Sequence, residues 1–232
     1  IKKAVYNTPS FLLSNKKGSF FSLPLSHKPL SRFQGFHLCN PTKSSWEVHK
    51  VLENIHPNKT PLKLINKLWC FERHYENSFE RFFLPDDKDV LIYETKNLKE
   101  STISLDMRPI YDFHNLGRNY SIKGYKDYIL IKYKRQDYHL YLAIAHNGVD
   151  YDELEDWTET SYTLDKKRNS HPTTLYIYRA LKLFLKPNSI ISFSASLIKK
   201  EAIRNARNGL KNINKLKQKT KYKTKLKLKE DI

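Results

Sequence analysis

The sequence predicts a mainly β protein, an antiparallel two-sheet β-sandwich followed by a C-terminal amphipathic helix and a basic tail. Three observations carry this prediction. The 232 residues are 39% hydrophobic and 13% aromatic, enough to bury a large core and too apolar for a disordered chain. Short segments rich in aromatic and β-branched residues recur between polar turns as far as residue 196. A basic, helix-periodic segment then replaces them.

Twelve segments are expected to form strands, on apolar content and flanking turn residues. They are 10–14, 19–25, 35–39, 68–74, 79–84, 89–94, 101–107, 128–133, 138–145, 161–164, 174–185 and 189–196. Alternation of side chains is clearest in DYILIKYK and HLYLAIAH, and Gln136 and Asp137 between them predict a tight hairpin. ISFSAS alternates apolar residues with serines, the pattern of a half-buried antiparallel strand.

The C-terminal part has two halves. Apolar residues over 197–216 recur at three- and four-residue spacing and predict an amphipathic helix. They are Leu197, Ile198, Ala202, Ile203, Ala206, Leu210, Ile213 and Leu216. Gly209 is expected to weaken this helix and to interrupt it. From Lys217 onward lysines alternate with neutral residues, and their mutual repulsion predicts disorder. The expected organisation is a sandwich domain over 1–198 and a basic helical linker and tail over 199–232.

Net charge is concentrated in that tail. The chain holds 42 Lys and Arg against 24 Asp and Glu, a formal charge of +18. Thirteen of the basic residues and three of the acidic ones lie in 199–232, so the tail carries +10 and the rest +8. A charge of this size ordinarily indicates a nucleic-acid partner. Its position restricts that alternative hypothesis to non-specific, salt-sensitive binding of nucleic acid through the tail.

Several kinds of site are not indicated by the sequence. No apolar run is long enough to span a membrane, and no signal-peptide pattern opens the chain, so we expect no membrane partner. Two cysteines, Cys39 and Cys70, predict neither a disulfide framework nor a four-cysteine zinc site, and favour a reducing, cytoplasmic setting. The nine histidines form no metal-ligand pair, and phosphate-binding glycine loops are absent. We therefore expect no metal and no cofactor.

Two further features leave alternatives open. An acidic run, VDYDELEDW, holds Asp150, Asp152, Glu153, Glu155 and Asp156. Paired carboxylates can hydrolyse glycosidic bonds, which would make the chain a self-contained enzyme, whereas the simpler interpretation is a solvated loop. Trp46, Trp69 and Trp157 can stack on sugar rings or contact another domain, or they can belong to the core.

A spaced pattern near the N-terminus is more specific. Residues 11–38 read FLLSNKKGSFFSLPLSHKPLSRFQGFHL. The segment resembles the opening of the N-terminal domain of glycogen debranching enzymes (amylo-α-1,6-glucosidases) and related prokaryotic glucoamylases. The residues that match the family pattern in register are Asn15, Gly18, Phe20, Ser22, Arg32, Phe33 and Gly35. Departures are Lys16, Ser19, Leu23 and His27, where the family usually has glycine, and Gln34, where histidine is common. Weaker similarities follow at 104–115, at Trp157 and Tyr162 with 176–185, and at 183–196.

The resemblance implies a function as well as a fold. In that family a β-sandwich domain precedes an α/α toroid that carries the catalytic acids, and a helix links the two. The chain is then expected to be the non-catalytic N-terminal domain, or a split subunit, of an enzyme of α-glucan breakdown, with no catalytic acid of its own. Its expected partners are the toroid, as domain or subunit, and an α-glucan such as glycogen or maltooligosaccharide. Arg32, Phe33 and Gly35 are expected to hold a strand and a turn in place.

Overall fold

The computed structural model describes residues 10–24, 28–41 and 46–230. Its elements in chain order are β1 (Ser10–Ser14), β2 (Phe20–Pro24), β3 (Gly35–Pro41), β4 (Trp46–His56), β5 (Lys63–Asn66), β6 (Phe71–His74), β7 (Phe79–Phe83), β8 (Leu91–Lys96), β9 (Glu100–Pro109), β10 (Asn119–Gly124), β11 (Tyr128–Arg135), β12 (Tyr138–His146), β13 (Asp150–Ser161), α1 (Thr163–Lys167), β14 (Thr174–Phe184), β15 (Ile190–Ser196), α2 (Lys199–Lys211) and α3 (Ile213–Glu230).

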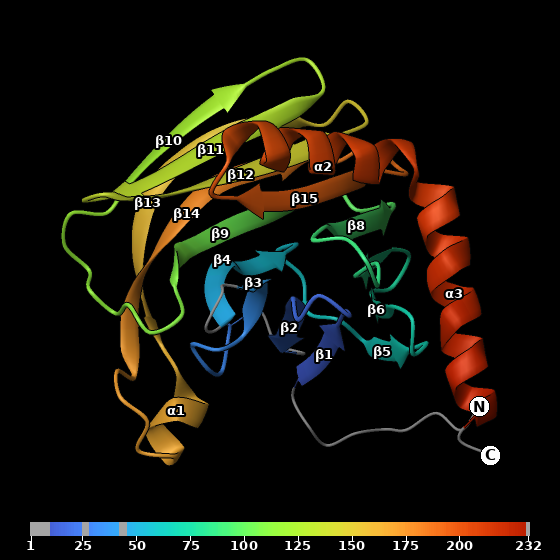
Figure 1. Ribbon diagram of the computed structural model, residues 1–232, viewed down its shortest axis with the longest axis horizontal. Coiled ribbons are helices and arrows are strands. Elements are labelled where there is room, and N and C mark those ends of the chain that lie inside the picture. Colours follow the sequence, from blue (N-terminus) through green and yellow to red (C-terminus); the bar gives the residue numbers. More distant parts are fainter. Residues whose placement is uncertain (1–9, 25–27, 42–45, 231–232) are drawn as a thin grey trace.

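The strands form two stacked antiparallel sheets (Figure 1). Sheet A has the order β1-β2-β3-β4-β9-β14-β13, and sheet B the order β10-β11-β12-β15-β8-β7-β6-β5. This confirms the predicted two-sheet sandwich. Alternate side chains of both sheets meet in one apolar core that runs through the molecule. Phe11 of sheet A stacks on Phe71 of sheet B with ring centroids 3.8 Å apart, which joins the two sheets near their edges.

The predicted strands correspond to observed strands with one exception. The prediction of a strand over 161–164 was wrong, since α1 occupies Thr163–Lys167 and only Ser161 belongs to a strand, at the end of β13. Residue 25, the last of the predicted 19–25 strand, lies outside the described residues. The predicted hairpin is confirmed, because Arg135 pairs with Tyr138 across Gln136 and Asp137, with Gln136 at φ 52°.

Four observed strands were not predicted: β4, β5, β10 and β13. Strands β5 and β10 are the two edge strands of sheet B, and β13 is an edge strand of sheet A. Each of the three is paired on one side only and carries many polar side chains. Strand β4 is central and largely buried, yet it carries Lys50, Glu53 and Asn54. Lys50 and Glu53 pair with each other and with Asp106 and Tyr162, which are distant in sequence, so the amino-acid pattern of β4 alone resembles a surface segment.

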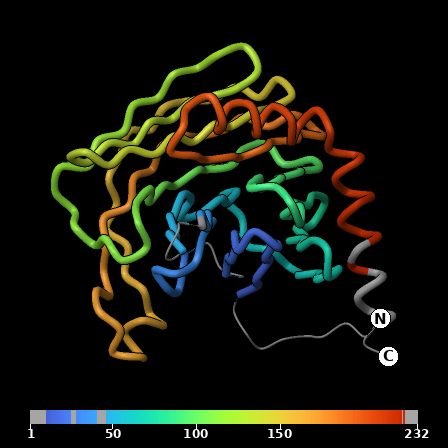
Figure 2. Tube along the Cα trace, viewed as in Figure 1, coloured from blue at the N-terminus to red at the C-terminus, as the bar shows by residue number. Residues whose placement is uncertain are grey.

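Helix α2 lies across the outer face of sheet B (Figure 2). Its buried residues Ala202 and Ala206 pack against Leu130, Ala143 and Ala145 of the sheet. The low helix propensity of glycine predicted a break at Gly209, and this prediction was wrong, because α2 continues through Gly209 to Lys211. The break between α2 and α3 falls at Asn212, the C-cap of α2. Gly209 is buried instead, and its missing side chain lets the helix approach the sheet closely.

A Gly209→Ala substitution is therefore expected to destabilise the protein. A Cβ at this position would lie 2.4 Å from Ser192 Oγ and 2.7 Å from Val90 Cγ1, so the helix would have to move away from the sheet. In an exposed helix the same change would stabilise by about 1 kcal/mol; here we expect a loss of about 1–3 kcal/mol in the free energy of unfolding. Urea denaturation of G209A beside N208A, at an exposed neighbour, measures the sign. Equal or higher stability of G209A would contradict the packing argument.

The lysine-rich segment is helical, contrary to the predicted disorder from Lys217 onward. Helix α3 extends beside the β5–β8 end of sheet B (Figure 2) and continues to Glu230. Ile213 and Leu216 pack against a cluster that includes Cys70 and Phe83. In a helix, lysines two residues apart are distributed around the axis, and those facing the body meet acidic or aromatic partners. Lys217 pairs with Glu94, Lys219 Nζ lies 2.6 Å from Asp87 Oδ2, and Lys221 Nζ lies 4.6 Å from the Trp69 ring centroid.

In the part of the chain that the structure describes, no helix combines the length and apolar composition needed to cross a membrane. The domain division at residue 198 stays a prediction.

Candidate functional site

The first half of the N-terminal pattern forms a tight turn between β1 and β2. Asn15 Oδ1 accepts hydrogen bonds from the backbone N–H groups of Lys17 and Ser19, both at 3.0 Å, and its Nδ2 donates to Lys88 O at 2.9 Å. Gly18 has φ +84°, a left-handed conformation that favours glycine. The space over Gly18 is filled by Cys39 and, at 3.8 Å from where a Cβ would stand, by Trp46. The turn therefore lies close to Trp46.

Two other residues of the pattern lie on the strand that follows this turn. Phe20 stacks on His37 of β3 with ring centroids 4.3 Å apart. His37 is completely buried, and its pKa is held well below the ordinary value by burial and by the nearby charge of Lys50. Ser22 pairs with Gly35 across the β2–β3 ladder. The first and second halves of the pattern are thus neighbours in the sheet.

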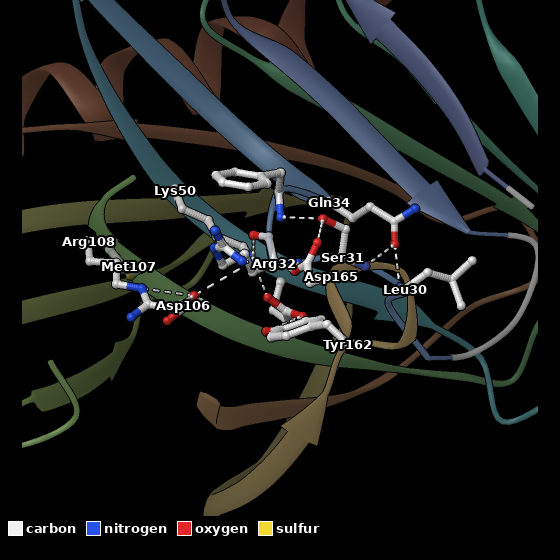
Figure 3. Close-up of polar contacts among 12 residues, drawn as sticks. Leu30, Ser31, Arg32, Gln34, Lys50, Asp106, Met107, Arg108, Tyr162 and Asp165 are labelled. Atoms are coloured by element: carbon white, nitrogen blue, oxygen red, sulfur yellow. Dashed lines mark hydrogen bonds and ion pairs between the residues drawn. The ribbon is translucent and has the colours of Figure 1, made fainter. Parts of the chain in front are cut away.

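The second half, Arg32 to Gly35, connects this part of sheet A to the α1 segment (Figure 3). The buried Arg32 guanidinium donates to Ser170 O at 2.6 Å and lies 4.4 Å from the half-buried Phe33 ring centroid. The Arg32 backbone N–H donates to Asp165 Oδ2 at 2.8 Å, and Ser31 Oγ donates to Asp165 Oδ1 at 2.7 Å. These contacts join the Arg32 segment to the α1 segment, and the role that the resemblance implies for Arg32 and Phe33 stays a prediction.

A buried ionic cluster lies beside Arg32 on sheet A (Figure 3). Asp106 is its centre: Arg108 NH2 lies 2.6 Å from Oδ2, Arg118 NH2 2.8 Å from Oδ1, and Lys50 Nζ 3.6 Å from Oδ2. Burial by itself would raise the pKa of Asp106, but the charges of these three cations outweigh it and lower the pKa. Lys50 also pairs with Glu53, whose pKa is raised by burial.

This cluster reaches a surface groove through the segment after β9. Arg108 NH1 donates to Asp112 O at 2.8 Å, and Asp112 lies in the groove wall. The groove has a volume of about 860 Å³, within the usual range for small-molecule sites. It lies at the end of the sandwich where β4 begins, β9 ends and the β11–β12 hairpin turns. Its lining consists of Trp46, Glu47, Val48, His49, Pro109, Ile110, Tyr111, Asp112, His114, Arg135, Gln136 and Tyr138.

Polar side chains in the groove are held by one another. Arg135 NH1 lies 2.6 Å from Asp112 Oδ2, and Arg135 Nε donates to Leu116 O at 3.2 Å. Tyr138 OH and His49 Nδ1 are 2.9 Å apart. Burial lowers the pKa of His49 and raises that of Tyr138, which keeps both side chains uncharged near neutral pH. The groove therefore holds a set of mutually hydrogen-bonded polar groups, and its cation, Arg135, is already paired with Asp112.

The three tryptophans lie in three different places. Trp46 is 61% exposed at the groove. Trp69 is half-buried beside α3, near Phe83 and Lys221. Trp157 is partly exposed on β13 and contacts Arg118 and Tyr178. Of the three tryptophans, Trp46 lines the groove, and Trp69 and Trp157 do not.

The acidic run forms the exposed edge strand β13 rather than the expected loop. Asp156 makes an exposed ion pair with Arg179 at 3.0 Å. Among the described residues, no three His, Cys, Asp or Glu side chains are grouped to hold a metal ion.

Sequence reasoning did not single out Tyr111, Asp112, Arg135, Tyr138 or His49. Two signals were present, since 104–115 resembled a family segment and the β11–β12 turn had been predicted as a hairpin. Neither signal indicated that these segments meet.

The fold is similar to that of a solved structure, a bacterial glucoamylase complexed with acarbose. The two chains are 12% identical and superpose with a TM-score of 0.51, over 96% of this chain and 38% of the glucoamylase. The chain therefore spans well under half the length of that protein. No family model and no curated protein sequence matches it.

Proposed function

We propose that this chain is the non-catalytic β-sandwich module of an α-glucan-degrading glycoside hydrolase, of the glycogen-debranching (amylo-α-1,6-glucosidase) or glucoamylase type. It works with an α/α toroid catalytic domain, carried on the same polypeptide or a separate one. Its role is to brace the toroid and to shape the rim of the substrate cleft. The fold shared with a bacterial glucoamylase supports this proposal.

One observation carries the proposal beyond fold. Four of the seven residues that match the debranching-enzyme pattern occupy positions with strict geometric requirements: a capping amide at Asn15, positive φ at Gly18 and Gly35, and a buried guanidinium at Arg32. Because this pattern lies on residues that hold the β1–β3 region and the α1 segment together, it supports a shared structural ancestry.

Reconstitution with a toroid tests the proposal. The full chain is mixed with a separately expressed α/α toroid domain of an α-glucan hydrolase from the same organism. Co-elution on size exclusion and α-1,6-glucosidase activity are then measured. We expect a stable complex and at least about a tenfold gain in activity over the toroid alone, as expected when binding correctly positions a site.

The basic tail requires a control in this experiment. Repeating it at about 0.5 M NaCl screens exposed charges and removes non-specific attraction between the tail and an acidic toroid. A complex that survives this salt concentration supports the proposal. A toroid that is fully active alone and forms no complex with the chain would contradict it.

Three lysines of α3 have partners in the body, which weakens the alternative of nucleic-acid binding through the tail at those positions. Lys217 and Lys219 are paired with Glu94 and Asp87, and Lys221 lies against the Trp69 ring. The charges of Lys217 and Lys219 are therefore partly neutralised, and all three lysines contribute to packing of the helix.

A further inference from the structure

We propose that the groove between Trp46 and Tyr138 binds a short, neutral oligosaccharide of linked hexopyranose units. This inference rests on the proposed function and names the ligand of one surface. Its basis is the combination, in one groove, of exposed aromatic faces with a rigid set of hydrogen-bonding groups.

Two aromatic side chains of the groove are largely exposed. Trp46 is 61% and Tyr111 79% exposed, and both line the groove. A hexopyranose ring presents an apolar face of C–H groups that can cover such a side chain. Clustered exposed aromatic side chains on a soluble domain mark binding sites more often than chance. Tyr111 lies in the segment that follows β9, and Trp46 is the first residue of β4. The two aromatic rings therefore come from different parts of the chain.

The polar groups are already oriented before a ligand arrives. Arg135 uses two of its five N–H donors, one to Asp112 Oδ2 and one to Leu116 O, which leaves three for a ligand. Asp112 Oδ1 accepts the His114 backbone N–H at 3.1 Å and keeps a second lone pair. A carboxylate beside a guanidinium can bind neighbouring hydroxyl groups, one as acceptor and the other as donor. Since these side chains are held in place, little conformational entropy is lost on binding.

The charge of the groove selects against anionic ligands. Arg135 is neutralised by Asp112, Glu47 adds a second carboxylate, and the lining contains no lysine. His49 is uncharged near neutral pH because burial lowers its pKa. A phosphate-bearing ligand would meet no unpaired cation here, whereas nucleic-acid sites combine stacking faces with excess positive charge. A neutral, hydroxyl-rich chain satisfies both the aromatic and the polar groups.

Calorimetric titration of the full chain with maltoheptaose tests the assignment. We expect saturable binding by the wild-type protein and at least about tenfold weaker binding by Trp46→Ala. A several-fold loss is expected in Tyr111→Ala, which removes an aromatic face, and in Arg135→Gln, which removes hydrogen-bond donors. Trp157→Ala removes a partly exposed tryptophan outside the groove and is the matched control, expected to bind as the wild type. Thermal melting of each variant checks that it is folded.

The outcomes separate this inference from the proposed function. No binding of maltoheptaose by the wild type, equal binding by W46A, or an equal loss in W157A would overturn the groove assignment, even if the toroid complex forms. If W46A weakens the toroid complex but leaves sugar binding unchanged, the groove is a domain contact and the assignment is wrong. Sugar binding through Trp46 without any toroid complex would support the groove and count against the proposed function.

Discussion

A Gly35→Ala variant is expected to lose about 4 kcal/mol or more of its free energy of unfolding, a loss that belongs to the severe end of single substitutions. Gly35 has φ +112°, and a Cβ there would lie 2.0 Å from the carbonyl oxygen of Leu52 and 3.2 Å from that of Glu53. These are backbone atoms of the central strand β4, next to the β3–β4 pairing of Phe36 with Leu52. They cannot move without separating the two strands.

Gly117→Ala is the matched control for this effect. Gly117 also has a positive φ, +73°, but among the described residues other than its two chain neighbours no atom lies within 4 Å of the position a Cβ would take. Its substitution should therefore cost only the backbone term of about 1–2 kcal/mol. Urea denaturation of both variants measures the difference. Equal losses in G35A and G117A would show that the close approach to Leu52 is not what requires glycine.

Asp106→Asn is expected to cost about 3–5 kcal/mol, because it leaves three buried cations without their shared carboxylate. Asp106 is completely buried, and Arg108, Arg118 and Lys50 all face it. Asparagine keeps the shape of the side chain, so the loss reports the charge rather than a cavity. Asp156→Asn removes an exposed partner of Arg179 and should change stability by less than about 1 kcal/mol.

The stability difference between the wild type and D106N is expected to depend on pH in a defined direction. Since the folded state lowers the pKa of Asp106, its stabilising contribution is complete above the unfolded value, near 3.9, and is lost as the pH falls through the folded value. The stability difference between wild type and D106N should therefore be largest near neutral pH and shrink in acid. Denaturation curves between about pH 7 and pH 3 test this. A difference that grows on acidification would contradict the ionised state assigned to Asp106.

The sandwich could be predicted from sequence because its strands with one polar face show clear alternation. The hairpin of 128–145 is the best example, and its two-residue turn follows from Gln136 and Asp137. Strand β4 could not be predicted in the same way. Lys50 and Glu53 resemble surface residues until Asp106 and Tyr162 are brought to them by folding, since Tyr162 OH donates to Glu53 at 3.1 Å and Asp106 lies beside Lys50.

The groove was predictable only in part. Trp46 was singled out as an aromatic candidate, but a tryptophan by itself does not indicate which residues surround it. Its neighbours Tyr111 and Arg135 come from segments more than sixty residues further along the chain. Their convergence depends on the order of strands in the sheets and on the register of β4 with β9, which pairs His49 with Pro109. Neither property can be inferred from the local spacing of residues.

The acidic edge strand has a consequence for solubility. Strand β13 ends sheet A, and an unpaired edge can join the edge of another molecule and begin aggregation. Its pairing with β14 is interrupted by a bulge between Glu153 and Asp156, where Glu155 has φ 49°. The bulge bends the edge, and the exposed carboxylates would meet like charges on a second copy placed alongside. The same residues that resemble a catalytic cluster in the sequence thus disfavour pairing of this edge of sheet A with a second copy of the chain.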